Sequence, residues 1–212
     1  MEVNLVSITH PRINNIDTPE DLIAYCARVS NPSNQLNTAT APKLLGYLIK
    51  HKHWSPFEMV DMCIEIKTSR AIAAQILRHR SFSFQEFSQR YSNITNFENI
   101  EWRLQGKTNR QVGDEIHQLD TEQQEAIDDY ISTAELVYNS LIEKGVAKEC
   151  ARMVLPLCTE TTMYMKGSIR SWVHYIDLRS KEDTQKEHRD IALKCRDLFV
   201  NNFPNTSKAL KW

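Results

Sequence analysis

Apolar and polar residues alternate with a period of two in three short segments of the chain. These segments are VNLVSI at 3–8, VDMCIEIK at 60–67 and TETTMYMK at 159–166. Successive side chains of a β-strand point to opposite faces, so this alternation is typical of a strand that buries one face. We therefore predict three strands that contribute to a sheet.

Most of the remaining chain carries the spacing of an amphipathic helix. The clearest example is 121–144, where Thr121 and Gln124 are spaced as a capping box. Thr18 followed by Pro19 is a typical helix start, because a hydroxyl caps the first turn and proline fits the first helical position. The predicted helices cover 18–30, 42–52, 69–80, 121–144, 147–155, 168–179 and 184–203.

The order of these elements predicts the fold class. Strands and helices follow one another without regular strand–helix–strand units, which is typical of α+β proteins. We expect a small mixed sheet with long helices, and a long loop over the polar, patternless residues 92–118. No repeat and no linker divides the chain, so residues 1–212 are predicted to form a single domain.

Charge and composition narrow the classes of partner. The chain has 26 Lys and Arg against 27 Asp and Glu, a net charge of −1. Proteins held to nucleic acid by phosphate attraction usually carry a basic excess, so we expect no nucleic-acid partner. No apolar run approaches the ~18 residues of a membrane span, and MEVNLVSITH lacks the features of a signal peptide. We expect no membrane association.

The cysteines point to the cytoplasm. They are five in number, scattered, and contain no C-x-x-C pair, which favours reduced thiols over a disulfide framework or zinc knuckle. His51 and His53 are poorly spaced for one metal site, so we predict no metal. With five glycines and no G-x-G-x-x-G, a Rossmann dinucleotide loop is absent.

The segment RHRSFSFQEFSQRY at 78–91 mixes charged and aromatic residues too closely for a clean separation of faces. One interpretation is a solvated charged surface above core phenylalanines. A second is a nucleic-acid site, with arginines on phosphates and aromatic rings stacked on bases. A third is a pocket for a small phosphorylated, ring-bearing ligand, in which arginine binds the anion and Gln85 and Ser88 supply hydrogen bonds. The residues alone favour the third interpretation slightly.

Several spaced motifs resemble those of the flavin-dependent thymidylate synthases. Arg78-His79-Arg80, seven residues and Ser88 match the R-H-R-x7-S signature, and 86–92 resembles E-x-S-x-R-Y-S. The resemblance extends along the chain in the family's order. It includes ARVS at 27–30, HWSPFE at 53–58, ARMVLP at 151–156, Arg170-Ser171 and Leu178-Arg179.

Three positions depart from the family pattern. Gln85 stands where the family often has Asn, and Ser168 and His174 each replace a common Asn. Each substitute keeps a hydrogen-bonding group, so the flavin contacts that the resemblance implies at these positions are retained as expectations.

The resemblance implies reductive methylation of dUMP to dTMP. The carbon donor would be methylenetetrahydrofolate, and FAD, reduced by NADPH, would deliver the hydride. The family uses no cysteine nucleophile, and here no cysteine lies in the motif. By resemblance Arg179 is the catalytic cation that favours the N3-deprotonated uracil ring, a role that suits a guanidinium of high pKa.

The resemblance also implies the ligand sets and the assembly. Ser88 would bind phosphate, since no partner base for a nucleophile is evident. Family members are homotetramers with active sites between subunits; 121–144 could be an oligomer core or the core helix of a monomer. The implied FAD residues are Ser30, Ser55, Arg78, His79, Arg80, Glu86, Ser168, Ile169, Arg170 and His174. The implied dUMP residues are Gln75, Arg78, Glu86, Phe87, Ser88, Gln89, Arg90, Arg152 and Arg179.

Overall fold

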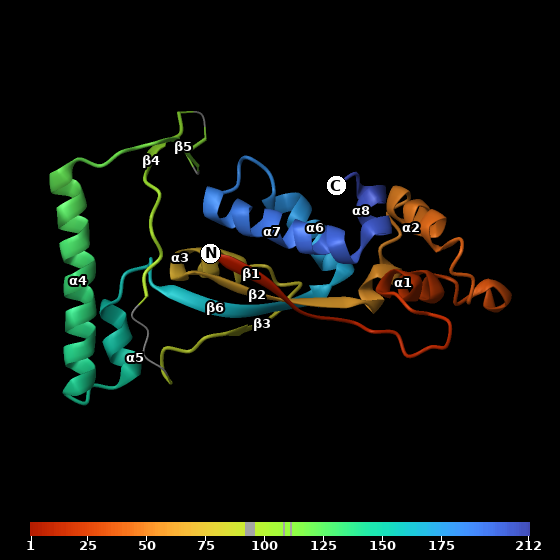
Figure 1. Cartoon of the computed structure of the whole chain (residues 1–212), viewed down its shortest axis with the longest axis horizontal. Helices are drawn as coiled ribbons and strands as arrows, with labels where there is room; N and C mark the ends of the chain where they lie inside the picture. The colour runs from red at the N-terminus through yellow and green to blue at the C-terminus, as the bar shows by residue number, and fades with distance from the viewer. Residues whose placement is uncertain (92–95, 108, 111) are drawn as a thin grey trace.

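The computed structural model describes residues 1–91, 96–107, 109–110 and 112–212. Within these ranges, four strands form one antiparallel sheet at the centre of the molecule, in the order β1-β2-β6-β3 (Figure 1). Helices cover one face of this sheet and extend beyond both of its ends, which confirms the α+β class. The strands are β1 (Glu2–Ile8), β2 (Asp61–Ser69), β6 (Glu160–Ser168) and β3 (Ser83–Glu86).

The period-two pattern produces a sheet with one buried face. Met62, Ile64 and Ile66 of β2 are completely buried, as are Met163 and Met165 of the neighbouring β6. The residues between them point to the other face, where polar side chains meet solvent. Two central strands were therefore predicted correctly from alternation alone, each within two residues of its observed bounds.

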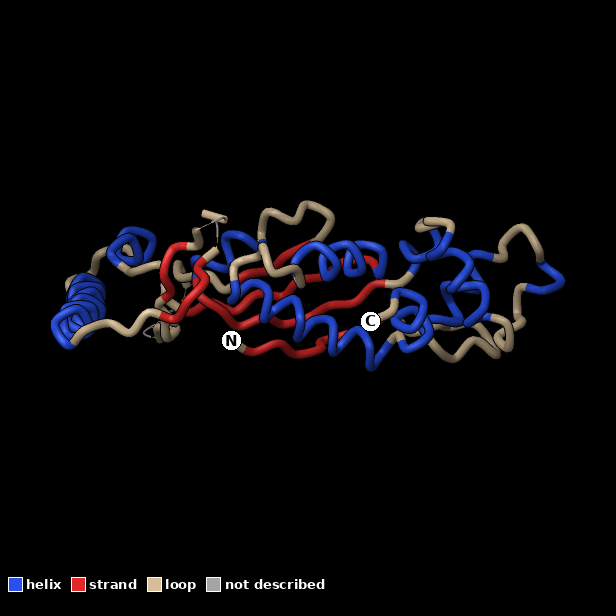
Figure 2. The backbone as a smooth tube through the Cα atoms, turned by 90° about the horizontal axis from the view of Figure 1, so that it is seen from above, coloured by secondary structure: helices blue, strands red, loops and turns tan. Residues whose placement is uncertain are grey.

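Three helices lie over the buried face (Figures 1 and 2): α3 (Arg70–Ile76), α6 (Ile169–Arg179) and α7 (Lys186–Asn202). Trp172 of α6 is completely buried against the sheet, and its indole Nε1 donates to the Met62 carbonyl over 2.9 Å. This bond satisfies the only polar atom of a large core side chain and fixes α6 on β2.

Short helices close one end of the sheet. They are α1 (Pro19–Ala27), α2 (Ala41–Lys50), α8 (Pro204–Leu210) and the 3₁₀ turns η1 (Pro32–Asn34) and η2 (Ser55–Met59). The predicted cap of α1 is confirmed, because the Thr18 hydroxyl accepts from the Asp21 amide over 3.1 Å. The helix predicted over 184–203 is observed as α7, whereas α8, which begins with Pro204 in its first turn, was not predicted.

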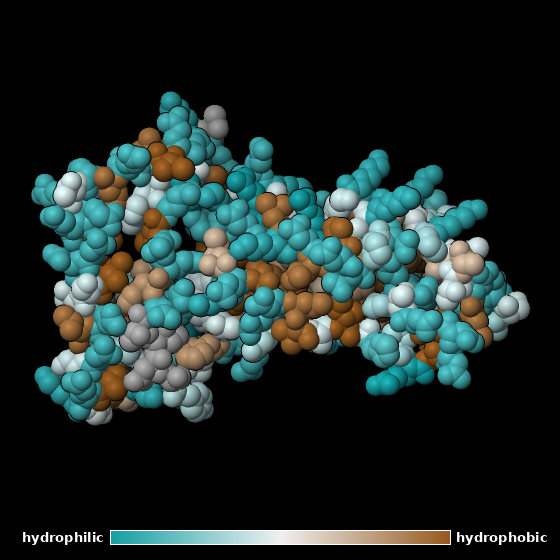
Figure 3. Space-filling view, viewed as in Figure 1, coloured by the Kyte–Doolittle hydropathy of each residue, from teal (hydrophilic) through white to brown (hydrophobic). Residues whose placement is uncertain are grey.

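The opposite end carries an arm made of α4 (Thr121–Glu143), α5 (Lys148–Ala151) and η3 (Arg152–Val154). In Figure 1 α4 stands across the end of the sheet, and Figure 2 shows it end on. Only Ala134 and Tyr138 of α4 are buried, so this helix is not the core helix of a monomer. Tyr130, Leu136 and Val137 are exposed, and Figure 3 shows apolar atoms among the polar ones there.

Three sequence predictions need correction. The capping box of α4 uses Asp120 and Gln123, one residue before the predicted pair, because the aspartate carboxylate accepts from the Gln123 amide at 2.8 Å. The helix predicted over 69–80 ends at Ile76. Part of the predicted loop over 92–118 forms the hairpin of β4 (Arg103–Gln105) and β5 (Gly113–Ile116).

The early end of α3 has a structural reason. Residues after Ile76 turn so that Phe82 packs edge-on against Trp172, with ring centroids 4.9 Å apart. Phe82 covers Gly167, where a Cβ would lie 2.5 Å from its ring. β3 then pairs with β6 in antiparallel register.

The described residues also bear on two other expectations. All five cysteines are free, as predicted. Searching the ranges that the structure describes, we find no helix that is both long and apolar enough to cross a bilayer.

Candidate active site

The turn between α3 and β3 brings His79 against α6. Its Nε2 accepts a hydrogen bond from Nε of Arg179 over 2.9 Å. Its ring meets Tyr175 edge-on, with centroids 4.9 Å apart. Tyr175 and Arg179 are four residues apart, so the regular geometry of an α-helix puts them on one face, where both can contact the same imidazole.

Burial and the neighbouring charge fix the protonation state of His79 in this pair. Burial and, to a smaller extent, the charge of Arg179 together lower the pKa of His79 to about 4. The imidazole is therefore neutral near pH 7, and because Nε2 accepts, its proton sits on Nδ1. Among the described residues, the two terminal amino groups of Arg179 have no protein partner. They remain available as a planar cationic fork.

A pocket of ≈ 510 Å³ lies on the other side of α6. Glu58 of η2 organises its rim: the carboxylate accepts from Arg170 at 2.5 Å and from the Ser168 hydroxyl at 3.1 Å. His174 packs edge-on against Trp54. Each of the pocket's two cations is paired with a carboxylate, Lys166 with Asp61 at 2.8 Å and Arg170 with Glu58 at 2.5 Å. Together with several hydroxyls, these ion pairs give the pocket a polar lining that can donate to a ligand. Its lining is Glu58, Asp61, Ser81, Ser83, Lys166, Gly167, Ser168, Arg170, Ser171 and His174.

Seven of the ten predicted flavin residues lie outside this pocket's lining, among them Ile169, Ser55 and Ser30. Ile169 is completely buried and its backbone N–H donates to the Val60 carbonyl, so its side chain faces the core. Ser55 is exposed on η2, the same short helix that carries Glu58. Ser30 is exposed after α1, and the structure records no contact between it and the pocket.

Arg70 holds the carboxylate of Glu86. Its NH1 donates to Glu86 Oε1 at 2.8 Å, and its NH2 donates to the Phe87 carbonyl at 3.1 Å. The Thr161 hydroxyl donates to the same carboxylate oxygen over 3.0 Å. Sequence reasoning missed Arg70 and Thr161, because only the folded sheet brings these positions next to the motif.

The motif continues as a turn at 88–91. The Arg90 amide donates to the Ser88 hydroxyl oxygen at 3.3 Å, and the described residues place no histidine in hydrogen-bonding contact with Ser88. The Phe87 amide donates to the Thr162 carbonyl, so it is not free to bind a ligand. Ser92, the last motif residue, lies outside the described residues.

Gln89 and Arg152 come together in a second hollow, of ≈ 260 Å³, beside Arg70. Gln89 is only 6% exposed, and its amide nitrogen has no partner among the described residues. Nε of Arg70 is likewise buried and unpaired there. Because buried donors without acceptors are costly, this hollow suits an anionic oxygen.

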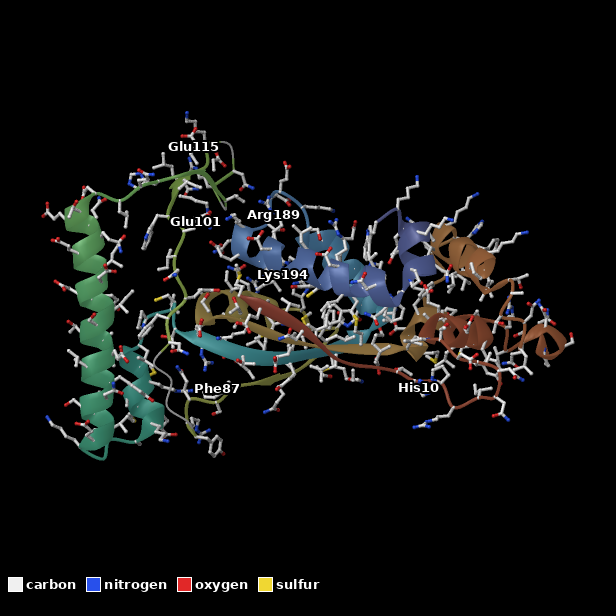
Figure 4. The ribbon with its side chains drawn as sticks, in the orientation of Figure 1. His10, Phe87, Glu101, Glu115, Arg189 and Lys194 are labelled. Carbon is white, nitrogen blue, oxygen red and sulfur yellow. The ribbon has the colours of Figure 1, made fainter. Side chains whose placement is uncertain are left out.

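The chain alone does not gather all predicted residues. Phe87 lies at the end of β3 in Figure 4, while the labelled Glu101 lies across β6 from it. Ser30 and Ser55 belong to the α1 end of the molecule, and Arg152 belongs to the arm at the other end. Arg78 and Arg80 are exposed between them.

Comparison with solved structures finds the same fold in another protein. A crystal structure of the UMP/dUMP methylase PolB from Streptomyces cacaoi, bound with 5-Br dUMP, superposes with a TM-score of 0.81 over 99% of this chain and 94% of that chain. Sequence identity is 23%, so this likeness shows the fold alone.

Sequence relatives identify the family. The family model described as "Thymidylate synthase complementing protein" matches residues 13–205. A probable flavin-dependent thymidylate synthase of Paramecium bursaria Chlorella virus 1 is 51% identical, and a flavin-dependent thymidylate synthase of Synechocystis sp. (strain ATCC 27184 / PCC 6803 / Kazusa) is 50% identical. Both alignments cover 100% of both chains. The chain belongs to the flavin-dependent thymidylate synthase family.

Proposed function

We propose that the protein converts dUMP to dTMP, with methylenetetrahydrofolate as carbon donor, FAD as cofactor and NADPH as reductant. One observation carries the proposal beyond family membership: a neutral imidazole, His79, holds the guanidinium of Arg179, and both terminal amino groups are unpaired among the described residues. This arrangement presents a fixed cation to a planar ligand edge that offers oxygen and nitrogen acceptors.

Arg179 can activate the pyrimidine without a covalent bond. Removing the N3 proton of uracil develops negative charge over N3 and O4, and an oriented cation stabilises that charge. His79 contributes by accepting from Nε, which fixes the guanidinium plane. Because His79 is neutral, it neither repels Arg179 nor competes for the anionic ligand.

The protonation state of the thiols supports a mechanism without a cysteine nucleophile. Burial raises the pKa of Cys26, Cys63 and Cys158, and it raises the pKa of Cys195 strongly. These four side chains are therefore protonated near pH 7, whereas a cysteine nucleophile needs the thiolate. Cys150 is exposed on α5, away from the Arg179–His79 pair.

The pocket beside α6 has the donor set for part of FAD. Lys166 and Arg170 can bind diphosphate oxygens in exchange for their carboxylate partners Asp61 and Glu58, and the Ser81 and Ser171 hydroxyls lie on the same wall. Arg78 and Arg80 add exposed guanidinium groups from the neighbouring turn. Bound FAD would supply a hydride after its reduction by NADPH. The chain's own residues would bind and orient it, and His174 would wall one side with Trp54.

The second hollow suits the phosphate of dUMP. Gln89 and Arg152 contribute unpaired or cationic donors to it, and the backbone N–H groups of Ser88 and Gln89 have no recorded partner in the described chain. Phosphate oxygens accept readily from such groups. Ser88 acts here as a ligand, because its hydroxyl already accepts from the Arg90 amide and has no base beside it.

A homotetramer with active sites between subunits would complete this site. The predicted residues lie toward both ends of one chain, and α4 exposes apolar side chains that a second copy would cover. The cytoplasm is the compartment we propose, since the five cysteines are free thiols.

Two measurements test the proposed function. Protein loaded with excess FAD and then heat-denatured should release FAD into the supernatant, and the loaded protein should form dTMP from dUMP, methylenetetrahydrofolate and NADPH. If the protein neither binds FAD nor forms dTMP, the proposal is refuted. Tight binding of single-stranded oligonucleotide at ~200 mM salt, without competition by dUMP, would instead favour the nucleic-acid interpretation.

A further inference from the structure

Five side chains form a continuous hydrogen-bonded chain beneath the Arg179–His79 pair. It runs from Tyr175 through His188, Gln75 and Gln185 to Glu187. The successive distances are 3.2 Å from the Tyr175 hydroxyl to His188 Nε2, 3.3 Å from His188 Nδ1 to Gln75 Oε1, 2.6 Å from Gln75 Nε2 to Gln185 Oε1, and 2.9 Å from Gln185 Nε2 to Glu187 Oε2.

The carboxylate at one end sets the direction of every bond. Burial alone would raise the pKa of Glu187, but hydrogen bonds, first of all from Arg103, lower it. Glu187 is therefore an acceptor only, and the Gln185 amide must turn its NH₂ group toward it. The oxygen of Gln185 then faces Gln75, so Gln75 must donate its own NH₂ group and turn its oxygen to His188.

His188 completes this directional sequence. It must donate from Nδ1 to the Gln75 oxygen, which leaves Nε2 to accept from Tyr175. The ring is completely buried, and burial followed by the charge of Arg179 lowers its pKa to about 3. A neutral His188 with its one proton on Nδ1 satisfies both neighbours. In the other tautomer the unprotonated Nδ1 would face the Gln75 oxygen, so that two acceptors would meet.

The consequence falls on Gln75, which lies near the end of α3, four residues before His79. An amide nitrogen carries two protons, and Gln185 takes one of them. No other protein acceptor is recorded for Gln75 within the described ranges. Without the chain, the amide could rotate and present its oxygen to the site.

We propose that His188, Gln185 and Glu187 are positioning residues that lock the Gln75 amide with its second N–H directed at an oxygen of the bound nucleotide. Neither His188 nor Glu187 needs to touch the ligand. The inference rests on the proposed function, because Gln75 is a nucleotide ligand only in that account. It adds the device that determines which atom of Gln75 the nucleotide meets.

Glu187→Gln tests the direction of the chain. Glutamine keeps the shape but can offer either end of its amide to Gln185, so the Gln75 orientation is no longer imposed. We expect dUMP to bind about tenfold more weakly, the equivalent of one hydrogen bond to an anionic or carbonyl oxygen, with a smaller change in kcat. Glu101→Gln is the matched control, because Glu101 also pairs with Arg103 but does not touch the chain. It should retain wild-type dUMP affinity.

The tautomer of His188 gives a readout independent of activity. In ¹⁵N-histidine-labelled holoenzyme, the nitrogen shifts of His188, assigned with His188→Asn, should report a proton on Nδ1. In Glu187→Gln the signal should move toward a mixture of tautomers. A wild-type proton on Nε2 would overturn the inference, as would equal dUMP affinity in Glu187→Gln and Glu101→Gln.

These outcomes are separable from failure of the proposed function. If wild-type protein forms no dTMP and binds no dUMP, the proposed function fails, whatever the tautomer. If wild-type protein binds dUMP and turns it over, while Glu187→Gln changes neither the affinity nor the His188 signal, only the positioning role fails.

Discussion

The β6–α6 region and the α4 arm bury their side chains very differently. In the first, Trp172, Tyr175 and Ile176 pack into the core, and the polar atoms of Trp172 and Tyr175 are paired with Met62 and His188. In the second, a longer helix buries only Ala134 and Tyr138 and leaves the Tyr138 hydroxyl unpaired among the described residues.

The contrast shows which parts of the site one chain can organise by itself. The Arg179–His79 pair and the Gln75 chain rest on a complete core, so a single chain supports them. Arg152 and the hollow beside it belong to a region whose apolar surface is partly uncovered. We therefore expect the two regions to respond differently to mutation.

Arg179→Lys should have the largest effect. Lysine keeps the charge but loses the planar fork and the Nε bond to His79. Losing such a contact in a desolvated site costs ~2.7–4 kcal/mol, so dTMP turnover should fall about 10²–10³-fold. Steady-state kinetics with a parallel FAD titration checks this, and FAD affinity should stay near wild type. Near-normal turnover with bound FAD would show that Arg179 is not the activating group.

Gly167→Ala should destabilise the core region. An added Cβ would meet the Phe82 ring at 2.5 and 2.7 Å, and that ring is held against Trp172. Overpacking of this kind costs about 1–3 kcal/mol. Urea unfolding measures the loss. Gly46→Ala is the control, because nothing lies within 4 Å of its added Cβ and it should not destabilise α2. Equal stability of both variants would contradict the packing argument.

Acid should weaken the core region through His188. Its folded pKa of about 3 lies below the ordinary value of 6.5, so the unfolded state takes up the proton first. Stability is complete above about pH 6.5 and falls as the pH drops toward the folded pKa, by roughly 2 kcal/mol between pH 7 and pH 5 from this group. Unfolding free energies at both values, compared with His188→Phe, measure this contribution. An unchanged pH slope in the variant would contradict it.

Leu136→Glu should have the smallest effect on the chain's own stability, because this side chain is 69% exposed. The unfolding free energy extrapolated for the isolated chain should stay within about ±0.5 kcal/mol. Its solution mass, by analytical ultracentrifugation, should fall below that of the wild-type oligomer. Ile116→Glu is matched, since Ile116 is also 69% exposed but lies outside α4. If both variants remain oligomeric, α4 is not part of the proposed interface.

Local sequence patterns predicted those strands and helices whose formation depends mainly on neighbouring residues. Alternation predicted β2 and β6, and the Thr18 cap and the α4 helix followed from short-range signals. β3 was missed, although Phe82 and Phe84 alternate with polar residues. Its formation depends on pairing with β6, eighty residues later, which local propensity does not contain.

The same limit applies to the site. The motif and the family resemblance identified His79, Glu86 and Arg179, and the structure shows what holds them. No sequence signal marks Arg70 as the partner of Glu86, or His188 as the partner of Gln75, because these contacts join distant segments. Ile169 shows the converse, since a motif position was predicted as a ligand and its side chain lies in the core.

In the proposed reaction an oriented cation, and no enzyme thiolate, activates the pyrimidine. Changing Cys26, Cys63, Cys150, Cys158 and Cys195 singly to alanine tests it most directly, with dTMP formation measured alongside circular dichroism and dUMP binding. The account predicts that each folded variant still forms dTMP, with losses no larger than its loss of stability explains. A variant that folds and binds dUMP but forms no dTMP would contradict it.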